Sequence, residues 1–553
     1  MNITVAKTAG FCMGVRRAVE MALDASNRAD GPIFTYGPLI HNPQVLNILA
    51  EKGISVIRDI PEHGSGTVLI RAHGVPPQQR DRLRAAGFTV IDATCPKVIK
   101  VQSIIAKHAR EGAAVIIIGD RAHPEVIGLL GYAGNNGHVA ETMEDLEGLP
   151  VFETAIIVAQ TTQNKAFFER VARWAEAAHP HYRIFNTICD STESRQADVQ
   201  HLAEKVDAVV VVGGRESGNT RRLFDIAAAS GKPAVHIETE AELDLRRMGN
   251  PRSIGITAGA STPNWIIRRV YREIENQMMG RHRGLQRLRF AFQRNLLLSN
   301  VYLTAGAGCL TVAAARLQGL VPSPAAVGLA MLYLFCMHTF NNLMDISSDR
   351  FNDPDRAAYF QKNRHLLSGL TILSGLLGLV LAAAMGPLFL LLLVCMSFMG
   401  MVYIINLMPR ALAGKFQPKI RDIPGSKTVL VALAWGIVTT LVPAIDGFGH
   451  IRPVTVLVFA WAGGLVFVRT AFFDILDMQG SRIVGKETIP ILLGEKRTMA
   501  LLKNLSGLMM MGLMAASLAG MVSTLGWVLS LCPLSMLVFL SAHEQGGLPA
   551  GLR

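Results

Sequence analysis

Long apolar runs recur in the second half of the chain, and they constrain its fold more than any other feature. Eight of them lie near residues 296–317, 325–344, 366–385, 387–408, 428–446, 453–473, 499–521 and 525–541. A run of about 17 to 25 apolar residues can cross a bilayer as a helix. Before residue 280, charged helical stretches alternate with short apolar strands. The sequence therefore predicts a soluble domain at 1–280, a basic juxtamembrane linker at 281–295 and an all-α polytopic membrane domain at 296–553.

Lysines and arginines are unevenly distributed around these runs. They gather in the loops after the second, fourth and sixth runs and in the segment before the first run, at Arg281, Arg283, Arg287, Arg289 and Arg294. Because cytoplasmic loops of membrane proteins are enriched in these residues, we expect these loops and the first half of the chain to face the cytoplasm. The net charge of +12 is then a membrane feature, favoured by anionic lipid, and we expect no nucleic acid partner. The first thirty residues have no long apolar stretch, so we expect no secretory signal. The apolar runs and the basic loops together predict a multi-pass protein of the inner membrane.

Three cysteines stand far apart in the polar first half, in the strings GFCMGV (Cys12), DATCPKV (Cys95) and NTICDSTESRQ (Cys189). Zinc ribbons and compact ferredoxin loops have ligands only a few residues apart, so this spacing excludes both. Three segments would have to converge on one centre. Three thiolates are one ligand too few for a closed four-iron cluster, which would leave one iron open to substrate. The other cysteines, in the apolar runs, are expected to pack as small hydrophobic side chains.

Several apolar strands of the first half end in polar or glycine-rich residues, as in TVLIRAHG, AAVIIIGDRAHPEV, TAIIVAQTTQ, DAVVVVGGRESGNT and SIGITAGAST. Helical stretches follow most of them, which indicates α/β units with parallel strands whose carboxyl ends collect functional loops. These loops and that around His41 hold His41, His73, His123, Glu125, Thr161, Ser217, Asn219 and Ser261. Imidazole, hydroxyl and amide groups beside glycines suit a diphosphate, and the single carboxylate could move protons.

Each of these residues also has a plain structural interpretation. A histidine in a glycine-containing loop is often only a hydrogen-bonding residue, and a TT or GNT string can be a helix cap. Glu125 follows a proline at an expected helix start, where the helix dipole favours any acidic residue. The functional interpretation depends on the number of these residues and on their shared position at strand ends.

The first 275 residues resemble the 4-hydroxy-3-methylbut-2-enyl diphosphate reductase family, also called LytB or IspH. The matching strings, in order, are GFCMGVRRAVE, GPLIHNPQV, IRAHGVP, DATCPKV, HPEVIG, QTT, NTICDSTESRQ and TAGAST. The resemblance implies a trefoil of three α/β lobes around a central 4Fe-4S cluster. It also implies the last step of the non-mevalonate pathway, in which the allylic hydroxyl of the substrate is removed reductively to give isopentenyl and dimethylallyl diphosphate.

The resemblance also assigns roles to individual residues. Cys12, Cys95 and Cys189 would hold the cluster, and Glu125 would supply protons with Thr161 and His123. The diphosphate would be bound by His41, His73, His123, Ser217, Gly218, Asn219 and Ser261. The family pattern NSSN reads ESGN here, so one hydroxyl contact is missing at Gly218 and weaker substrate binding is expected. Ferredoxin or flavodoxin is the implied electron donor.

Acidic clusters follow the second and sixth apolar runs, in NNLMDISSDRFNDPD and DILDMQGSRIVGKET. Asp345 and Asp349 are about one helical turn apart, as Asp474 and Asp477 nearly are, so each pair can direct oxygen atoms to one side. Such carboxylates at a membrane boundary suit Mg²⁺ bound to a diphosphate. A single cluster would be read as solvated loop residues, but two clusters at corresponding places favour a function.

This half resembles the UbiA superfamily of intramembrane prenyltransferases, which bind a Mg²⁺-complexed prenyl diphosphate through two aspartate motifs and commonly have nine spans. The resemblance implies one site at Asn341, Asp345 and Asp349 and a second at Asp474 and Asp477, with Lys486 as a phosphate contact. It departs from the family pattern at Asn342 and Ser481, where aspartate is usual. These departures lower the expected metal affinity.

The leading hypothesis is thus a bifunctional isoprenoid enzyme of a reductase and a membrane prenyltransferase, whose prenyl acceptor the sequence does not name. A second hypothesis keeps the reductase and treats the membrane half as a non-catalytic anchor, in which case replacing Asp345 and Asp349 leaves prenyl transfer unchanged or absent throughout. A third treats the first half as an iron-sulfur redox sensor. A sensor needs the cysteines but no proton donor, so Glu125→Gln separates it from an enzyme.

Overall fold

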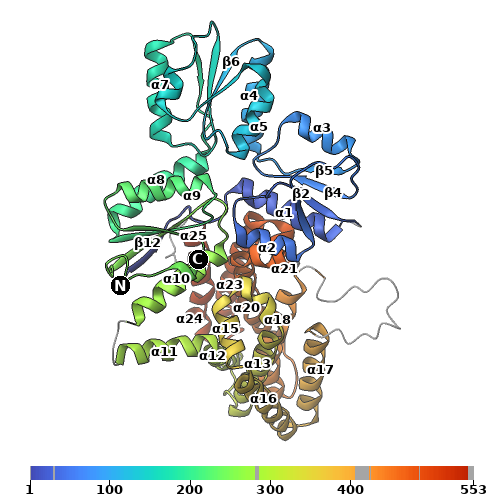
Figure 1. The fold of residues 1–553 in the computed structure, drawn as a ribbon. Coiled ribbons are helices and arrows are strands. Elements are labelled where there is room, and N and C mark those ends of the chain that lie inside the picture. Colours follow the sequence, from blue (N-terminus) through green and yellow to red (C-terminus); the bar gives the residue numbers. More distant parts are fainter. Residues whose placement is uncertain are drawn as a thin grey trace. The chain divides into compact units, whose positions relative to one another are not determined.

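The computed structural model describes residues 2–28, 31–280, 285–404, 423, 425–484 and 486–545. The chain divides into two compact units, Met1–Arg281 and His282–Arg553. The first holds all the strands in the described part of the chain and is called the three-sheet unit, and the second is called the helical unit (Figure 1).

Three four-stranded sheets form the framework of the three-sheet unit, and every strand pair in them is parallel. The first sheet contains β2 (Ile33–Tyr36), β3 (Ile54–Ile57), β4 (Thr67–Ile70) and β5 (Thr89–Asp92). The second contains β6 (Ala114–Ile118), β7 (Gly137–Ala140), β8 (Ala155–Ala159) and β9 (Arg183–Phe185). The third contains β10 (Ala208–Val212), β11 (Ala234–Ile237), β12 (Ser253–Ala258) and β1 (Asn2–Val5).

The three sheets share one topology. Their strand orders are β3-β2-β4-β5, β7-β6-β8-β9 and, read in the same direction, β11-β10-β12-β1. The third lobe differs only in taking its last strand from the start of the chain. The unit is therefore a threefold repeat of structure, which confirms the predicted trefoil of α/β lobes, although no repeat is visible in the sequence.

Helices cover these sheets (Figure 1). They are α1 (Met13–Arg28), α2 (Pro43–Glu51), α3 (Pro77–Ala85), α4 (Pro96–Arg110), α5 (Pro124–Ala133), α6 (Met143–Glu147), α7 (Lys165–Ala178), α8 (Asp190–Lys205), α9 (Gly218–Ala229) and α10 (Asn264–Met279). Every residue of β6, β8 and β10 is buried, in the strings AVIII, AIIVA and AVVVV. Continuous apolar strands of this kind are typical of parallel sheets covered on both faces. All five strands predicted from the sequence are present, as β4, β6, β8, β10 and β12.

The helical unit begins with α11 (Leu285–Leu298), α12 (Val301–Leu317), α13 (Pro324–Met344), α14 (Ile346–Asn352), α15 (Pro354–Lys362), α16 (Arg364–Met385) and α17 (Pro387–Ile404). It continues with α18 (Ser426–Gly436), the π-helical segment η4 (Ile437–Leu441), α19 (Val442–Phe448), α20 (Pro453–Leu476), α21 (Met478–Val484), α22 (Ile489–Leu493), α23 (Glu495–Leu518), α24 (Leu525–Leu529) and α25 (Leu531–Glu544).

Each of the eight predicted spans corresponds to helix, but fewer of the described helices are long and apolar enough to cross a membrane. Among the described residues, six helices are long and apolar enough, or seven if the bent pair α11 and α12 forms one span. That pair bends by 66°, and Asn300 between the two helices has a left-handed backbone with φ of 65°. Of the fourth predicted span, near 387–408, the structure describes the apolar helix Pro387–Tyr403 of α17, and residues 405–422 lie outside the described residues.

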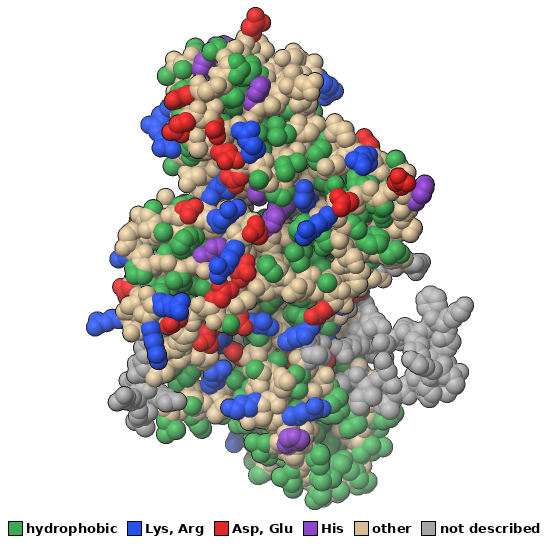
Figure 2. All heavy atoms as spheres, viewed as in Figure 1, with side chains coloured by type: hydrophobic (Ala, Val, Ile, Leu, Met, Phe, Trp, Pro, Cys, Tyr) green, Lys and Arg blue, Asp and Glu red, His purple; other side chains and the backbone are tan. Residues whose placement is uncertain are grey.

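The outer surface of the helical unit is apolar. Side chains exposed on α16 and α17 include Leu366, Ile372, Leu376, Val380, Leu391 and Phe398. Hydrophobic side chains accordingly cover the visible end of this unit in Figure 2, whereas charged groups are scattered over the three-sheet unit. An exposed apolar belt on long helices is expected where lipid replaces water. Of the predicted basic linker, Arg281, Arg283 and the Arg287 side chain lie outside the description, and Arg294 pairs with Asp355 at 3.6 Å.

Candidate functional site

Each predicted cluster cysteine directly precedes a helix. Cys12 stands before α1, Cys95 before α4 and Cys189 before α8. These are equivalent positions, because each follows the fourth strand of its lobe. A helix N-terminus carries partial positive charge and favours a thiolate.

The backbone holds the three cysteines in the same way. The Cys12, Cys95 and Cys189 N–H groups donate to the carbonyls of Ala260, Ala72 and Thr161, at 3.1, 2.9 and 2.9 Å. Each carbonyl lies two residues beyond the end of the third strand of its lobe, β12, β4 or β8. The repeat of the fold thus brings the three distant cysteine segments to one centre.

The thiols fit a shared inorganic group. Burial raises the pKa of the Cys95 thiol, and the neighbouring Cys12 and Cys189 raise it further, so the three sulfurs are close enough to interact. All three cysteines are free. Gly14 leaves room beside them, because a Cβ at Gly14 would lie 2.5 Å from Cys95 Sγ.

The predicted diphosphate residues also occupy equivalent places in the three lobes. His41, His123 and Ser217 follow β2, β6 and β10, which occupy the same place in the strand orders of the three sheets. Each of these residues is at or next to the N-cap of a helix, α2, α5 or α9. His73, Thr161 and Ser261 follow the third strand of each lobe. The carboxyl ends of the strands therefore place all six beside the cysteines.

Three imidazoles form the centre of this group. Ligand nitrogen atoms of His41, His73 and His123 all lie within 4.8 Å of one another. Burial lowers the pKa of each, that of His73 well below its usual value and that of His123 to about 4, so the rings are neutral at pH 7. His41 Nε2 and His73 Nδ1 are buried without a hydrogen-bond partner. These atoms have hydrogen-bonding capacity that a polar ligand could use.

Small polar groups of the third lobe complete the pocket. Ser261 Oγ donates to the His41 carbonyl at 3.1 Å and lies 3.5 Å from Ser217 Oγ. Asn219 is buried and its Nδ2 has no hydrogen-bond partner. A Cβ at Gly218 would lie 3.7 Å from His123 Cδ2, so the first turn of α9 is next to the imidazoles. Together these groups can surround an anion.

Glu125 is buried, with 2% of its surface exposed, and both its oxygens are hydrogen-bonded to Thr161. Thr161 N–H donates to Oε1 at 2.6 Å and Thr161 Oγ1 donates to Oε2 at 2.8 Å. Burial raises the Glu125 pKa against the effect of these bonds, so the site favours the protonated carboxyl more than water does. The Glu125 N–H donates to His123 Nδ1 at 3.1 Å, so a neutral His123 carries its proton on Nε2.

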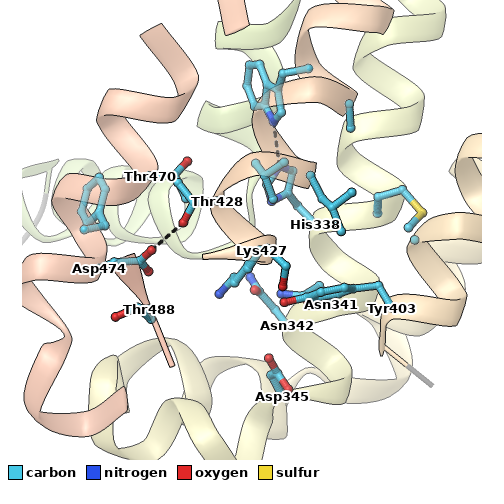
Figure 3. Close-up of a pocket in the computed structure, with 18 of the residues that line it drawn as sticks. His338, Asn341, Asn342, Asp345, Tyr403, Lys427, Thr428, Thr470, Asp474 and Thr488 are labelled. Atoms are coloured by element: carbon cyan, nitrogen blue, oxygen red, sulfur yellow. Dashed lines mark hydrogen bonds between the residues drawn. The ribbon is translucent and has the colours of Figure 1, made fainter. Parts of the chain in front are cut away.

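A separate cavity of about 450 Å³ lies within the helical unit (Figure 3). At its polar end are the predicted residues Asn341, Asp345, Asp349, Asp474, Asp477 and Lys486. Its apolar end includes Leu334, Met337, Met396, Met399 and Trp435. A cavity with acids at one end and apolar side chains along its length suits an amphiphile with a metal-bound anionic head.

Hydrogen bonds and ion pairs organise the polar end. Lys486 Nζ lies 3.0 Å from Asp345 Oδ2, and Thr428 Oγ1 donates to Asp474 Oδ2 at 2.7 Å. Lys427 lies between Asp474 and Asn341 in Figure 3 and interacts with the charges of Asp474, Asp349 and Asp345. Aspartates that interact with lysine charges here can also bind a divalent metal ion. Lys427 and Lys486 can contact an anion bound to that ion.

Comparison with known proteins places both units in families. The "LytB protein" family profile matches residues 3–275, and the "UbiA prenyltransferase family" profile matches residues 301–544. The 4-hydroxy-3-methylbut-2-enyl diphosphate reductase of Nitratidesulfovibrio vulgaris (strain DP4) is 46% identical over 291 residues, which cover 50% of this chain and 100% of that protein. The chain belongs to the LytB family. Its helical unit matches the UbiA prenyltransferase family over residues 301–544. The three-sheet unit is called the LytB unit below, and the helical unit is called the UbiA unit.

Further relatives of each unit can be named. The 4-hydroxy-3-methylbut-2-enyl diphosphate reductase of Aquifex aeolicus is 42% identical to the LytB unit over 282 residues, covering 50% of this chain and 96% of the relative. A solved UbiA homologue from Archaeoglobus fulgidus, bound to GPP and Mg²⁺, is 19% identical, with a TM-score of 0.35, and the match covers 45% of this chain and 87% of that one.

The two departures from the UbiA pattern have local explanations. Asn342 Nδ2 donates to Asn300 Oδ1 at 3.5 Å, and Asn300 is the left-handed residue at the bend before α12. Ser481 Oγ accepts a bond from Asn352 Nδ2 at 3.5 Å, which joins α21 to α14. Asn342 thus links the first acidic segment to the bend at Asn300, and Ser481 links the second acidic segment to the first.

Sequence reasoning missed several residues of both sites. In the LytB unit, Arg195 and Arg222 join lobes, and Arg222 bonds to Asp120 at 2.9 Å. In the UbiA unit, Lys427 was counted only among the basic loop residues that set the orientation of the chain in the membrane. His338 within a span was not noted, although its Nε2 accepts a bond from Trp435 at 2.9 Å in the cavity. A histidine inside an apolar run is a signal that could have found it.

Proposed function

We propose that the LytB unit reduces 4-hydroxy-3-methylbut-2-enyl diphosphate to isopentenyl and dimethylallyl diphosphate, the last step of the non-mevalonate pathway. Two electrons and two protons enter, the bond between the allylic carbon and its hydroxyl breaks, the oxygen leaves as water and one C–H bond forms. The observation that carries the proposal is the convergence of three thiols, three neutral imidazoles and a buried carboxyl from three lobes. The names of the closely similar relatives support the same reaction.

Cys12, Cys95 and Cys189 would hold a 4Fe-4S cluster with one open iron. When bound, that group supplies electrons one at a time and a Lewis acid for the hydroxyl. The helix N-termini that follow the cysteines would stabilise its negative charge. A ferredoxin or flavodoxin would deliver the electrons.

The diphosphate would bind to the imidazoles of His41, His73 and His123 and to the third-lobe groups at Ser217, Gly218, Asn219 and Ser261. The unpaired nitrogens of His41, His73 and Asn219 supply hydrogen-bonding capacity that the protein itself does not use. The backbone at the start of α9 adds N–H donors where Gly218 has no side chain. This anchoring leaves the allylic end free to face the cysteines.

Glu125 and Thr161 would form the proton path, with His123 beside it. When Glu125 is protonated, its carboxyl can donate to Thr161 Oγ1 across the 2.8 Å contact, and the threonine hydroxyl can pass a proton on. His123 Nε2–H points away from Glu125, since Nδ1 accepts the Glu125 N–H, and is available to the substrate. Protonation of the leaving oxygen lowers the barrier to breaking its bond to carbon.

We also propose that the UbiA unit transfers a prenyl group from a prenyl diphosphate to an acceptor. The bond between the allylic carbon and the diphosphate would break, the carbon would bond to the acceptor, and the acceptor would lose a proton. Mg²⁺ would be held by Asn341, Asp345, Asp349, Asp474 and Asp477, with Lys486 on the phosphate. Support comes from the family profile and from these acids meeting at one end of an apolar cavity.

The helical unit also supports a proposal on location. We place the protein in the inner membrane as a multi-pass protein, with residues 1–280 and the acidic loops in the cytoplasm and residues 281–295 as a linker to the membrane domain at 296–553. The apolar helices and the basic loops support this orientation. A lipid surface is then a permanent partner.

The test of the reductase uses the full chain, purified in detergent and loaded anaerobically with iron and sulfide. Substrate-dependent oxidation of reduced viologen should occur, should be lost in Cys95→Ser and should persist in Cys309→Ser, the matched exposed cysteine of the UbiA unit. A fully loaded wild-type chain without turnover would contradict the reductase and favour a redox sensor.

The test of the transferase compares Asp345→Asn with Asp446→Asn, an exposed acid on α19 outside the cavity. Mg²⁺-dependent hydrolysis or transfer of geranyl diphosphate should be lost only in the first variant, with reductase turnover unchanged in both. Equal activity in both variants, or none in the wild-type chain, would favour a membrane anchor.

A further inference from the structure

Arg195 is a buried arginine in the helix that begins at the cluster cysteine Cys189. It lies on α8 within the string NTICDSTESRQ, and only 3% of its surface is exposed. Arginine is almost never buried to this degree unless its charge has partners. Its surroundings therefore indicate what the charge does.

The guanidinium joins two of the three cysteine segments. Nη2 donates to the Gly10 carbonyl at 2.7 Å, two residues before Cys12, and Nη1 donates to the Ala258 carbonyl at 3.1 Å at the end of β12. Nε lies 3.4 Å from Ser191 Oγ, in the first turn of α8. These contacts fix the guanidinium between the Cys12 loop and the Cys189 helix.

The positive charge of Arg195 interacts with two of the three cysteines. Its electrostatic interactions include those with Cys12 and Cys189 and a smaller one with Asp198. The Asp198 carboxylate accepts bonds from Thr8 N–H and Thr8 Oγ1, both at 2.9 Å, whereas the hydrogen bonds of Arg195 go to neutral oxygens. Arg195 thus places a buried positive charge between the Cys12 loop and the Cys189 helix.

We propose that Arg195 is a positioning residue that sets the reduction potential of the iron-sulfur cluster by placing this charge beside two of its three sulfur ligands. The inference rests on the proposed reductase function. Three thiolates give the cluster a negative charge, and each added electron increases it. A fixed cation at low dielectric lowers the free energy of the reduced form and so raises the potential.

The experiment measures the midpoint potential of the cluster in the loaded full chain, by an anaerobic redox titration with dithionite followed by EPR. Arg195→Met removes the charge and the bonds, and Arg195→Lys keeps the charge but not the forked pair of bonds. Thr8→Ala is the matched control, because it weakens a tie between the same loop and α8 while leaving Arg195 in place.

We expect the ratio of reduced to oxidised cluster at a fixed potential to fall at least tenfold in Arg195→Met, a shift of about 59 mV to more negative potential for one electron. Arg195→Lys should recover most of this shift, and Thr8→Ala should show none.

An unchanged potential in Arg195→Met with full iron and sulfide would overturn the proposal. So would cluster loss in both arginine variants, which would show a purely structural role. A wild-type chain that takes up no cluster would instead refute the proposed function itself.

Discussion

Replacement of Glu125 by glutamine should separate catalysis from folding. The amide keeps the shape of the carboxyl, so its oxygen can still accept the Thr161 N–H and its nitrogen can donate to Thr161 Oγ1, in place of the 2.6 and 2.8 Å bonds of the carboxyl. The variant retains both contacts but has no acidic proton to give. General acid catalysis contributes about 10² to 10⁴ in rate, which corresponds to about 3 to 5 kcal/mol of barrier.

The stability of the Glu125→Gln variant should not fall with its rate. Burial raises the Glu125 pKa in the folded chain, so its contribution to stability is present below the ordinary carboxyl pKa and is lost as pH rises through the raised value. At pH 7 the neutral glutamine avoids this penalty, and the melting temperature should stay equal or rise.

The assay is anaerobic viologen oxidation by the loaded chain as a function of pH, alongside thermal unfolding. The wild-type rate should decline as pH rises through the raised Glu125 pKa, and Glu125→Gln should be slower by at least a hundredfold. A variant with near wild-type turnover, or one that is slow because it melts early, would refute the reasoning.

Three further predictions follow from the same pocket. Substrate binding to the three neutral histidines should take up protons near pH 7 and tighten as pH falls, because the diphosphate raises the imidazole pKa values that burial has lowered. Calorimetry in two buffers of different ionisation enthalpy would detect this proton uptake. A binding enthalpy that does not depend on the buffer would contradict the prediction. Gly14→Ala puts a methyl group 2.5 Å from Cys95 Sγ, so iron and sulfide content should fall, whereas Gly507→Ala, in open space, should keep full content; equal loading would be the contrary result. Gly218→Ser should lower KM by about 2- to 10-fold, because the added hydroxyl can make one more hydrogen bond to the diphosphate. The end of the Arg222 side chain, 3.0 Å from the new Cβ, has to shift to make room, and a raised KM would contradict the prediction.

The strand and cysteine patterns carried much of the fold prediction for the first half. Fully apolar strands such as AVIII ended in the loops where the predicted site residues are found, because parallel strands collect their loops at one edge. The shared strand order of the three lobes could not be read from the residues, because equivalent positions other than the three cysteines rarely carry the same residue type. His73, Thr161 and Ser261 occupy equivalent places with unrelated side chains.

The membrane half was predicted less completely. Hydropathy located all eight predicted spans on helices, but it gave no sign that the chain bends at Asn300, because a left-handed backbone depends on local geometry rather than on apolar content. Arg195 was overlooked for a related reason. A charged residue in a polar helix looks solvated in the sequence, and only the folded lobes reveal that it is buried between two cysteine segments.

The central claim is that the loaded chain removes the allylic hydroxyl from a five-carbon diphosphate. Turnover in deuterated water, with reduced viologen and 4-hydroxy-3-methylbut-2-enyl diphosphate, tests it by NMR and mass analysis of the products. The account predicts isopentenyl and dimethylallyl diphosphate, each with one new deuterium on carbon. Recovery of unchanged substrate from a chain whose cluster is fully assembled and reduced would contradict it.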